Sequence, residues 1–405
     1  MKKLLSALLI LAMLSGLILG GCSKSATTGT GKVLKVGYLG DMSWPATVDA
    51  IHNMDVYKDM YDKKGGLVIG GEKYTIDFIL YDTKGDQATS MAALNKLIFE
   101  DKVKFILSDF TPLSDAWVPV TEANKVIYSC QGVSPALFNP NNRYTFETGG
   151  LPSAAVCAPA WYAKNNPNVK TGLLASPDTQ MGHMGAGDAT AIMGSFGITV
   201  TDIFYPANQS DLSSLGTQVT KANPPMVMCQ GGGPTVDSLA QKAIYNAGWR
   251  GPFFTAPPST YIQMAAVTPP DVLEGQIISG EPGEFDPALT PASKEFKEAF
   301  IAKIGKWSGE RLGMATWEAV LAACQKAGTV DDTTRIADVI GNGLKYSGVA
   351  GDYIMTSRMD QGNSRTCCVA QQLYMKKIVN GKPEMIGTWS AEESKSILDS
   401  YFVKK

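Results

Sequence analysis

Hydrophobic and polar residues follow two different periods along the first third of the chain. Residues 33–39 alternate with a period of two, which predicts a strand, and apolar side chains recur at helical spacing in residues 47–62, which predicts a helix. The same signals continue to residue 129, with strands expected at 74–81, 103–107 and 126–129 and helices at 89–99 and 112–123. This regular exchange of strands and helices is typical of a parallel sheet covered by helices.

The pattern begins again near residue 150 and predicts a second unit of similar size. Its helices are expected at 154–164, 186–195, 212–221 and 236–247, and its strands at 171–175, 198–205, 226–229 and 253–256. Further elements are expected at 276–280 (strand), 291–304, 313–327 and 334–340 (helices) and 369–376 (strand). Two α/β lobes joined within one chain suggest a cleft between them, and ligands of such sheets bind outside the carboxyl ends of the strands.

The amino terminus has the features of a targeting segment. Lys2 and Lys3 precede an apolar run at 4–20, which suits a signal peptide better than a membrane-spanning helix of ~20 residues. The run ends in Leu-Gly-Gly-Cys22, which resembles the lipobox of bacterial lipoproteins. The resemblance implies a signal peptide at 1–21 and a lipidated, flexible tether at 22–32, and therefore anchoring to the membrane. The alternative is an uncleaved anchor helix that ends in an ordinary buried cysteine.

Charge and composition exclude several classes of function. The chain of 405 residues has 36 Lys and Arg against 38 Asp and Glu, so it lacks the basic footprint of a nucleic-acid-binding protein. His52 and His183 are its only histidines, which excludes a His-rich metal site. We find no GxSxG motif and no paired nucleophile and base, so we do not expect an enzyme. The glycines at 231–233 lack the spacing of a phosphate-binding loop, and no cofactor is expected.

Six cysteines follow Cys22, and we expect most of them to be buried free thiols. No CxxC pair is present, and Cys130 and Cys229 lie in apolar runs that predict strands. A strained disulfide between the adjacent Cys367 and Cys368 is the alternative for that pair.

The loop after the strand at 103–107 has the chemistry of an anion site. Thr111 is a good helix N-cap, and Pro112 fits the first helical position because its missing N–H costs nothing there. Free backbone amides and the positive end of the helix dipole would then lie beside the hydroxyls of Thr111 and Ser114, which suits a carboxylate. Plain helix capping is the alternative interpretation.

One known family is similar to this chain in the order and spacing of many segments. The matching segments are VLKVGYLG at 33–40, KKGGLVIGGEKYTIDFILYDTKGD at 63–86, KLIFEDKVKFILSD at 96–109 and GMATWEAVLAACQKAGTVD at 313–331. They resemble the leucine/isoleucine/valine-binding-protein family, the extracytoplasmic receptors of branched-chain amino-acid-type ABC transporters. The resemblance implies the type I periplasmic-binding-protein fold, in which two doubly wound parallel-sheet lobes are joined by three crossings. It places lobe 1 at 33–149 and 281–352 and lobe 2 at 150–280 and 353–405.

The same resemblance implies which residues contact the ligand. The loop with Thr111 aligns with the family's carboxylate-holding loop, and the loop at 131–133 adds a second contact, with Val133 where the family usually has Thr. Trp44 lies where the family often places an aromatic ring over the ligand, although packing within lobe 1 is the alternative. The expected ligand-binding residues are Trp44, Phe110, Thr111, Ser114, Gln131, Gly132, Val133, Met181, Gly232 and Pro258.

Lobe 2 departs from the pattern of amino-acid binders. Met181 takes the position of a Tyr, Gly232 lies in a loop that can carry another Tyr, and Pro258 stands where an acid pairs with the ligand ammonium. Loss of that acid removes the counter-charge that a buried ammonium needs. We therefore expect a carboxylate with an apolar or aromatic body, with a branched-chain amino acid as the alternative. In the latter case Glu281 or Glu284 would be the ammonium partner.

The expected function is that of a solute receptor. It would capture this small carboxylate outside the membrane, close on it and deliver it to the permease subunits of an ABC transporter. The alternative is a sensory subunit of the same fold that regulates a partner protein. His183 is expected at the rim of the cleft or on the surface.

Overall fold

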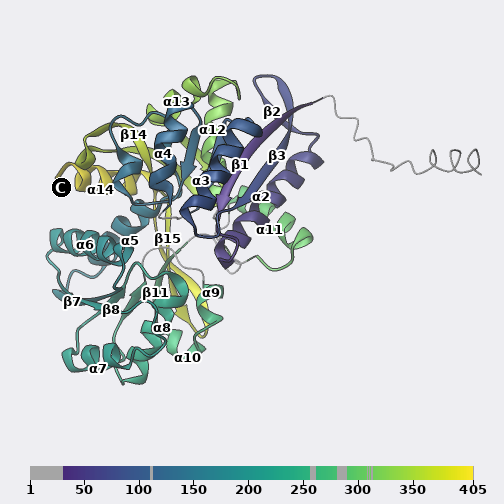
Figure 1. The fold of residues 1–405 in the computed structure, drawn as a ribbon. Helices are drawn as coiled ribbons and strands as arrows, with labels where there is room; N and C mark the ends of the chain where they lie inside the picture. Colours follow the sequence, from purple (N-terminus) through teal and green to yellow (C-terminus); the bar gives the residue numbers. More distant parts are fainter. Residues whose placement is uncertain are drawn as a thin grey trace, which may run out of the picture.

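The chain folds into two lobes, each built around one sheet (Figure 1). The structure is a computed structural model that describes residues 31–109, 113–255, 261–280, 290–307, 309, 311 and 313–404. The first sheet has nine strands in the order β12-β13-β14-β6-β5-β4-β1-β3-β2, and the second has seven in the order β16-β15-β11-β10-β9-β7-β8. The expected fold of two doubly wound α/β lobes is therefore confirmed.

Parallel strands form the centre of the first sheet, and antiparallel strands form its two edges. Its strands are β1 (Lys32–Gly40), β2 (Leu67–Ile69), β3 (Glu72–Asp82), β4 (Phe105–Ser108), β5 (Ile127–Cys130), β6 (Thr145–Glu147), β12 (Lys345–Gly348), β13 (Gly351–Arg358) and β14 (Asn363–Gln371). Strand β1 shows why the prediction succeeds. Val36 and Tyr38 are buried on one face of the sheet and Leu39 on the other, as the period of two requires.

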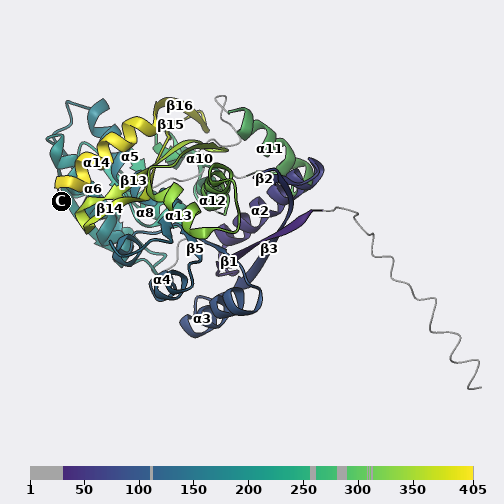
Figure 2. The same ribbon diagram turned by 90° about the horizontal axis from the view of Figure 1, so that it is seen from above.

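Helices cover both faces of the first sheet. One face packs against α2 (Pro45–Lys63), α11 (Pro291–Lys303), α12 (Met314–Ala327) and α13 (Thr333–Gly341). The other packs against α3 (Gln87–Asn95) with its π-helical extension η1 (Lys96–Glu100), α4 (Ser114–Ala123) and the short η2 (Pro135–Phe138). Figure 2 shows α3 and α4 on the side of the sheet opposite to α2 and α12.

The second sheet has the same layered construction. Its strands are β7 (Thr171–Pro177), β8 (Thr199–Tyr205), β9 (Val227–Cys229), β10 (Phe253–Thr255), β11 (Ile277–Gly280), β15 (Leu373–Val379) and β16 (Lys382–Trp389). One face packs against α5 (Leu151–Asn165), α6 (Gln180–Ser195) and α14 (Ala391–Lys404). The other packs against α7 (Ser213–Ala222) and α8 (Gly233–Asn246), with α9 (Tyr261–Ala265) and α10 (Pro270–Leu273) near its edge.

The last crossing between the lobes lies later than expected. Lobe 2 was expected to resume at residue 353, but β13 and β14 pair with each other and β14 joins β6, so both belong to the first sheet. The apolar run at 369–376 is divided between two sheets, because β14 ends at Gln371 and β15 begins at Leu373. The expected boundary at 352 is thus wrong, and the chain crosses at Gln372.

Polar contacts connect the crossings to one another. The backbone N–H of Gln371 donates to Ser153 Oγ at 3.3 Å, and the guanidinium of the buried Arg311 donates to the Gln371 side chain. Glu147 ends β6 and accepts from the backbone N–H of Leu151, the first residue of α5, at 3.2 Å. Burial raises the pKa of Glu147 to about 7, against the opposing effect of that N–H and of Arg311.

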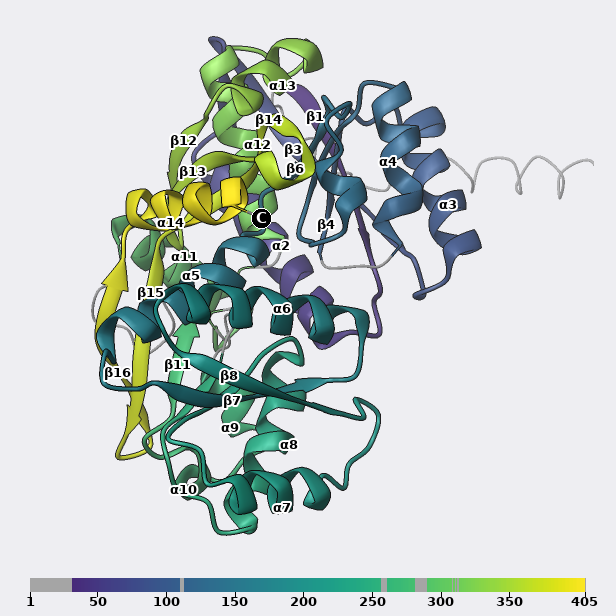
Figure 3. The same cartoon turned by 90° about the vertical axis from the view of Figure 1, so that its left-hand side faces the viewer.

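Helix α14 lies at the junction of the lobes and contacts both (Figure 3). Its Phe402 faces the Arg358 guanidinium at 4.2 Å from the ring centroid, and Phe138 lies on the same guanidinium at an equal distance. The next ring, Tyr401, donates its hydroxyl to Asp188 of α6 at 2.7 Å. The carboxyl-terminal helix therefore ties lobe 1 to lobe 2 in addition to the crossings.

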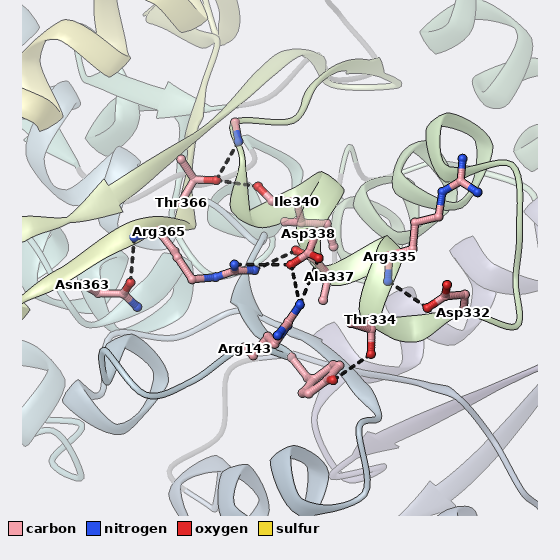
Figure 4. A network of polar contacts seen from close by, with 12 residues as sticks. Arg143, Asp332, Thr334, Arg335, Ala337, Asp338, Ile340, Asn363, Arg365 and Thr366 are labelled. Atoms are coloured by element: carbon pink, nitrogen blue, oxygen red, sulfur yellow. Dashed lines mark hydrogen bonds and ion pairs between the residues drawn. The ribbon is translucent and has the colours of Figure 1, made fainter.

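A surface network holds together the distant segments of lobe 1 (Figure 4). Asp338 of α13 receives two bonds from Arg143, at 2.9 and 3.0 Å, and a longer one from Arg365 of β14 at 3.4 Å. Arg143 precedes β6, so this one carboxylate links the amino-terminal part of the lobe with the part that the chain adds after its excursion through lobe 2.

The six cysteines in the described part of the chain are all buried and none forms a disulfide, which confirms the prediction of free thiols, Cys367 and Cys368 included. Among the described residues we find no group of three or more His, Cys, Asp and Glu side chains arranged to hold a metal ion. Within the same residues, every helix is either too short or too polar to cross a membrane.

Candidate ligand-binding cleft

The carboxyl ends of the parallel strands meet at one edge in each lobe. In the first sheet, Ser108 pairs with Cys130 and Cys130 with Glu147, so β4, β5 and β6 end side by side. In the second sheet, Ala175 pairs with Cys229 and Cys229 with Thr255, so β7, β9 and β10 end together in the same way. The loops that leave these edges are where ligands of such sheets bind.

A small pocket takes its walls from both edges. Val133, from the loop after β5, faces Met181 of α6 and Gly231, which lies just beyond β9. The cavity has a volume of about 20 Å³. Its complete lining is Val133, Leu151, Ala155, Met181, Met184, Gly185, Asp188, Gln230 and Gly231. The structure thus brings together two of the predicted site residues, Val133 and Met181, across the gap between the lobes.

Sequence reasoning missed the Gln230 side chain and the two helices that line the pocket. Gln230 follows directly after the buried strand β9, and only 1% of it is exposed. A polar residue at the carboxyl end of a strand in a parallel sheet was the signal that could have identified it. Leu151 and Met184 lie in α5 and α6 before the expected starts of these helices at residues 154 and 186.

The strand ends of lobe 1 form a polar edge that is fixed by hydrogen bonds within the protein. Asp109, the residue after β4, is 5% exposed. Its carboxylate accepts from the Tyr38 hydroxyl and, at 3.0 Å, from the backbone N–H of Gly313. The chain segment before α12 is therefore fixed to the end of β4 by a charge-assisted hydrogen bond.

Two neighbouring hydroxyl pairs complete this edge. Ser108 Oγ lies 2.8 Å from the Tyr128 hydroxyl, and Ser129 Oγ lies 2.6 Å from Thr148 Oγ1. Ser129 Oγ also donates to the backbone carbonyl of Thr316 at 2.8 Å. These polar groups are satisfied inside the protein, which leaves the edge rigid before any ligand binds.

The helix that follows the predicted anion loop differs from the expectation in where it begins. Helix α4 begins at Ser114, two residues later than expected, and Leu113 occupies the N-cap position, so the prediction of Thr111 as the N-cap is wrong. Ser114 is buried near the hydroxyl of Tyr128. Phe110 and Thr111 lie outside the described residues, and their contact with a ligand stays a prediction.

The other predicted residues of lobe 1 differ in exposure. Trp44 is the N-cap of α2 and 46% of it is exposed, so it does not pack in the core of lobe 1. Gln131 is half-buried and its amide contacts the carbonyl of Gly149 at 3.5 Å, in the first crossing, while Gly132 is buried beside Leu137. The loop at 131–133 therefore packs on the crossing and presents Val133 to the cleft.

Lobe 2 places Met181 on a helix rather than in a loop. Helix α6 begins at Gln180, six residues before the expected start, with the Thr179 hydroxyl accepting from the Gly182 N–H at 3.0 Å as N-cap. A Cβ atom at Gly182 would lie 1.9 Å from the carbonyl oxygen of Pro177, so only glycine allows this helix to begin so close to the end of β7. Met181 is thereby held at the first turn, facing the cleft.

A buried acid lies beneath the glycine loop of lobe 2. Asp237, in the second turn of α8, is 1% exposed, and the Tyr205 hydroxyl approaches its Oδ1 at 3.5 Å. Burial raises the pKa of this carboxyl to about 8, against the opposing effect of the Gly232 N–H and the Tyr205 hydroxyl. Gly232 is the N-cap of α8, and a Cβ atom there would lie 2.4 Å from Asp237 Oδ1, so the position is closed to the Tyr that the family's loop can carry.

Of the remaining residues named from the sequence, His183 lies in the described part of the chain. His183 lies on the surface, as expected, where its Nε2 is 2.7 Å from Asp178 Oδ1 and its ring packs on Phe204. Pro258, Glu281, Glu284 and the lipidation site Cys22 lie outside the described residues.

Two lobes joined by several crossings, with the carboxyl ends of both sheets turned to a shared cleft, define a ligand-binding protein of the two-lobed type. Residues 33–377 match the periplasmic binding protein family, and the chain belongs to that family. It is accordingly a binding protein rather than an enzyme.

Solved structures of similar fold carry the same architecture at low sequence identity. The leucine binding protein LivK from Thermotoga maritima is 16% identical, with 89% of this chain and 99% of that chain covered and a TM-score of 0.70. A solute binding protein of an ABC transporter from Rhodopseudomonas palustris, in complex with 3,4-dihydroxybenzoic acid, is 19% identical, with 89% and 98% covered and a TM-score of 0.69. A second one from R. palustris, in complex with benzoate, is 15% identical, with 88% and 96% covered and a TM-score of 0.66.

Proposed function

We propose that this protein is the extracytoplasmic solute receptor of an ABC importer and that its ligand is a small carboxylate with an apolar or aromatic body. The observation that carries the ligand class is the lobe 2 wall, where Met181 and Met184 face Val133. Thioether side chains adapt to flat or irregular apolar groups and make favourable contacts with aromatic rings. The benzoate and 3,4-dihydroxybenzoic acid complexes of two similar structures support the same class.

Within this proposal, the two lobes have different roles. The loop with Phe110 and Thr111 holds the ligand carboxylate, and Trp44, with its large exposed surface, closes over the apolar body. Pro258 provides no acid, so an ammonium group is not required. Ligand bound to lobe 1 then shifts the protein toward its closed form, because only the closed form makes the contacts of both lobes.

Calorimetric titration tests the ligand class directly. Benzoate and phenylacetate should bind, and leucine should bind more weakly or not at all. Thr111→Ala should weaken acid binding by ~1–3 kcal/mol if its hydroxyl holds a buried charged oxygen. Thr329→Ala is the matched control and should leave the affinity unchanged. Thr329 lies in the turn after α12, far from the cleft edge, because the carbonyl of its neighbour Gly328 approaches Gly70 at the opposite end of the sheet. Tight binding of leucine with none for the deaminated acids would contradict the proposal.

Closure is tested separately by small-angle scattering. A saturating acid should reduce the radius of gyration, since the lobes rotate about the crossings before α5, between β11 and α11, and at Gln372. A bound ligand without compaction would argue against the closing mechanism but not against the ligand class.

We further propose that lipid on Cys22 anchors the mature protein to the cell membrane. The apolar run that ends at Leu-Gly-Gly-Cys supports this placement. Cys22→Ser should leave the precursor uncleaved or release the protein from membranes, as judged by mass spectrometry and membrane fractionation. Unchanged mass together with unchanged membrane retention would refute it.

A further inference from the structure

Pro159 leaves one carbonyl of α5 without its helical partner. The residue lies inside the helix, and proline has no backbone N–H to donate to the carbonyl four residues earlier, that of Ala155. The Gln230 side chain fills the gap, since its Nε2 donates to the Ala155 carbonyl at 3.2 Å. A missing donor in one helix is thus replaced by an amide from the end of β9.

This contact fixes the orientation of the Gln230 amide. A carbonyl accepts only from the NH₂ end of the amide, so Oε1 must point away from Ala155. Gly185 of α6 holds the side chain from the other side, because a Cβ atom there would lie 3.1 Å from Gln230 Cγ. The Oε1 atom has no hydrogen-bond partner within the described part of the chain, although the side chain is only 1% exposed.

The unpaired acceptor belongs to a residue that lines the interlobe pocket. The cavity of about 20 Å³ has room for one water-sized group. Its other walls are mainly aliphatic and thioether side chains, among them Leu151, Met181 and Met184, which offer a bound water few of the partners it needs. A buried amide oxygen left unpaired is costly, and a group that donates to it gains correspondingly.

We infer that Gln230 is a specificity-determining residue that accepts a hydrogen bond from a small donor on the apolar body of the ligand, and that this donor is a neutral hydroxyl. This inference rests on the proposed function and refines its ligand class to a hydroxylated carboxylate. The neutral donor follows from the surroundings: the one carboxylate in the lining, Asp188, already accepts from Tyr401 and lies near the Arg358 cation. An ammonium group would find no unopposed counter-charge in this lining.

The test compares ligands that differ only in the donor. Wild-type protein is titrated with benzoate, the three hydroxybenzoates and the three methoxybenzoates, and phenylalanine is compared with 3-phenylpropanoate for an ammonium donor. At least one hydroxybenzoate should bind about tenfold more tightly than benzoate and than its methoxy counterpart. Gln230→Met, which keeps the length of the side chain, should reduce that preference to less than about threefold.

A second variant tests the role of Pro159. Pro159→Ala restores the backbone N–H to Ala155, which frees the Gln230 amide to turn its NH₂ group to the ligand, so the preference for hydroxy over methoxy should shrink. Pro119→Ala in α4 is the matched control, because Pro119 is also a helical proline but lies in lobe 1, and it should leave the preference intact.

The outcomes separate this inference from the proposed function. Equal affinity of the wild type for benzoate and all its hydroxy forms would overturn the role of Gln230 and leave the carboxylate class standing. A preference that survives Gln230→Met in full, or a larger gain from the ammonium of phenylalanine than from a hydroxyl, would also overturn it. Binding of none of the acids would overturn the ligand class of the proposed function and this inference with it.

Discussion

On the lobe 1 side of the cleft, the polar groups at the strand ends are paired within the protein, whereas on the lobe 2 side several have no partner among the described residues. Asp109, Ser108 and Ser129 belong to the first set. Ser176 Oγ, Gln230 Oε1 and Asp237 Oδ2, at or near the ends of β7, β9 and the start of α8, belong to the second. Polar groups that are already paired carry no desolvation penalty. Unpaired buried groups do carry one, so a ligand that supplies the missing hydrogen bond binds more tightly. Lobe 1 thus provides a rigid platform, and lobe 2 provides selectivity.

The strongest test of the rigid platform is Asp109→Ala. The change removes the buried carboxylate that accepts hydrogen bonds from the Tyr38 hydroxyl and the Gly313 N–H. Both donors then lose this acceptor in the protein interior. The free energy of unfolding should fall by about 3 kcal/mol in urea titrations.

Asp82→Ala serves as the matched control for this prediction. Asp82 also ends a strand of the same sheet and accepts from the N–H groups of Met42 and Lys84 at 3.1 and 2.9 Å, but it is exposed to water. Its loss should cost less than about 1 kcal/mol. Equal losses of unfolding free energy in the two variants would show that the buried hydrogen bonds of Asp109 do not stabilise lobe 1.

The unsatisfied edge of lobe 2 predicts a dependence of stability on pH. The pKa of Asp237 is near 3.8 in the unfolded chain and is raised by burial to about 8 in the folded protein. Between these values the folded protein keeps a proton that the unfolded chain has released. The contribution of this carboxyl to stability should therefore be greatest below about pH 4, fall as the pH rises, and level off above about pH 8.

Asp237→Asn should flatten that dependence. The variant should gain on the order of 2 kcal/mol at about pH 8 and change little at about pH 4, measured by urea unfolding at both values. Glu147, with a folded pKa of about 7, acts with the same sign between about pH 4.5 and 7, so a smaller slope remains. A variant that keeps the full slope of the wild type would exclude Asp237 as its source.

The smallest effect is expected on the outer surface of lobe 1. Asp338→Asn weakens the pairs with Arg143 and Arg365 shown in Figure 4, but its side chain is 39% exposed and water replaces much of what is lost. Thermal unfolding should register a loss of about 0.5–1 kcal/mol, reduced further by salt. A loss as large as that of Asp109→Ala would mean that the pairing of distant segments, rather than the cleft edge, dominates the stability of the lobe.

The sequence predicts the layers well because the hydrophobic periods are local. Strand β1 and helix α2 each show their period within one window, and their observed bounds lie close to the expected ones. The start of α6 was missed because its first turns are rich in glycine, which has low helix propensity, and the apolar spacing becomes visible only from Ala186.

Features that depend on distant partners were not predictable in this way. The crossing at Gln372 has no turn signal, because an apolar run continues on both sides of it and only pairing with different sheets divides it. The role of Gln230 depends on Pro159, some seventy residues earlier, and on the packing of α5 against the second sheet. Met181 and Val133 were found because the family resemblance supplied their positions, and the structure then placed them in one pocket.

The six buried cysteines make this protein convenient for site-directed labelling. Burial raises the pKa of every one of these thiols, to about 12 for Cys157, Cys324 and Cys367 and well above the ordinary value for the others. Thiolates are the reactive species, so these side chains are nearly inert to maleimides near neutral pH. A cysteine introduced at an exposed rim position such as Asp178, in a protein that begins after Cys22, would therefore carry a single fluorophore. Such a conjugate would convert closure of the cleft into an optical signal without removal of any native thiol from the fold.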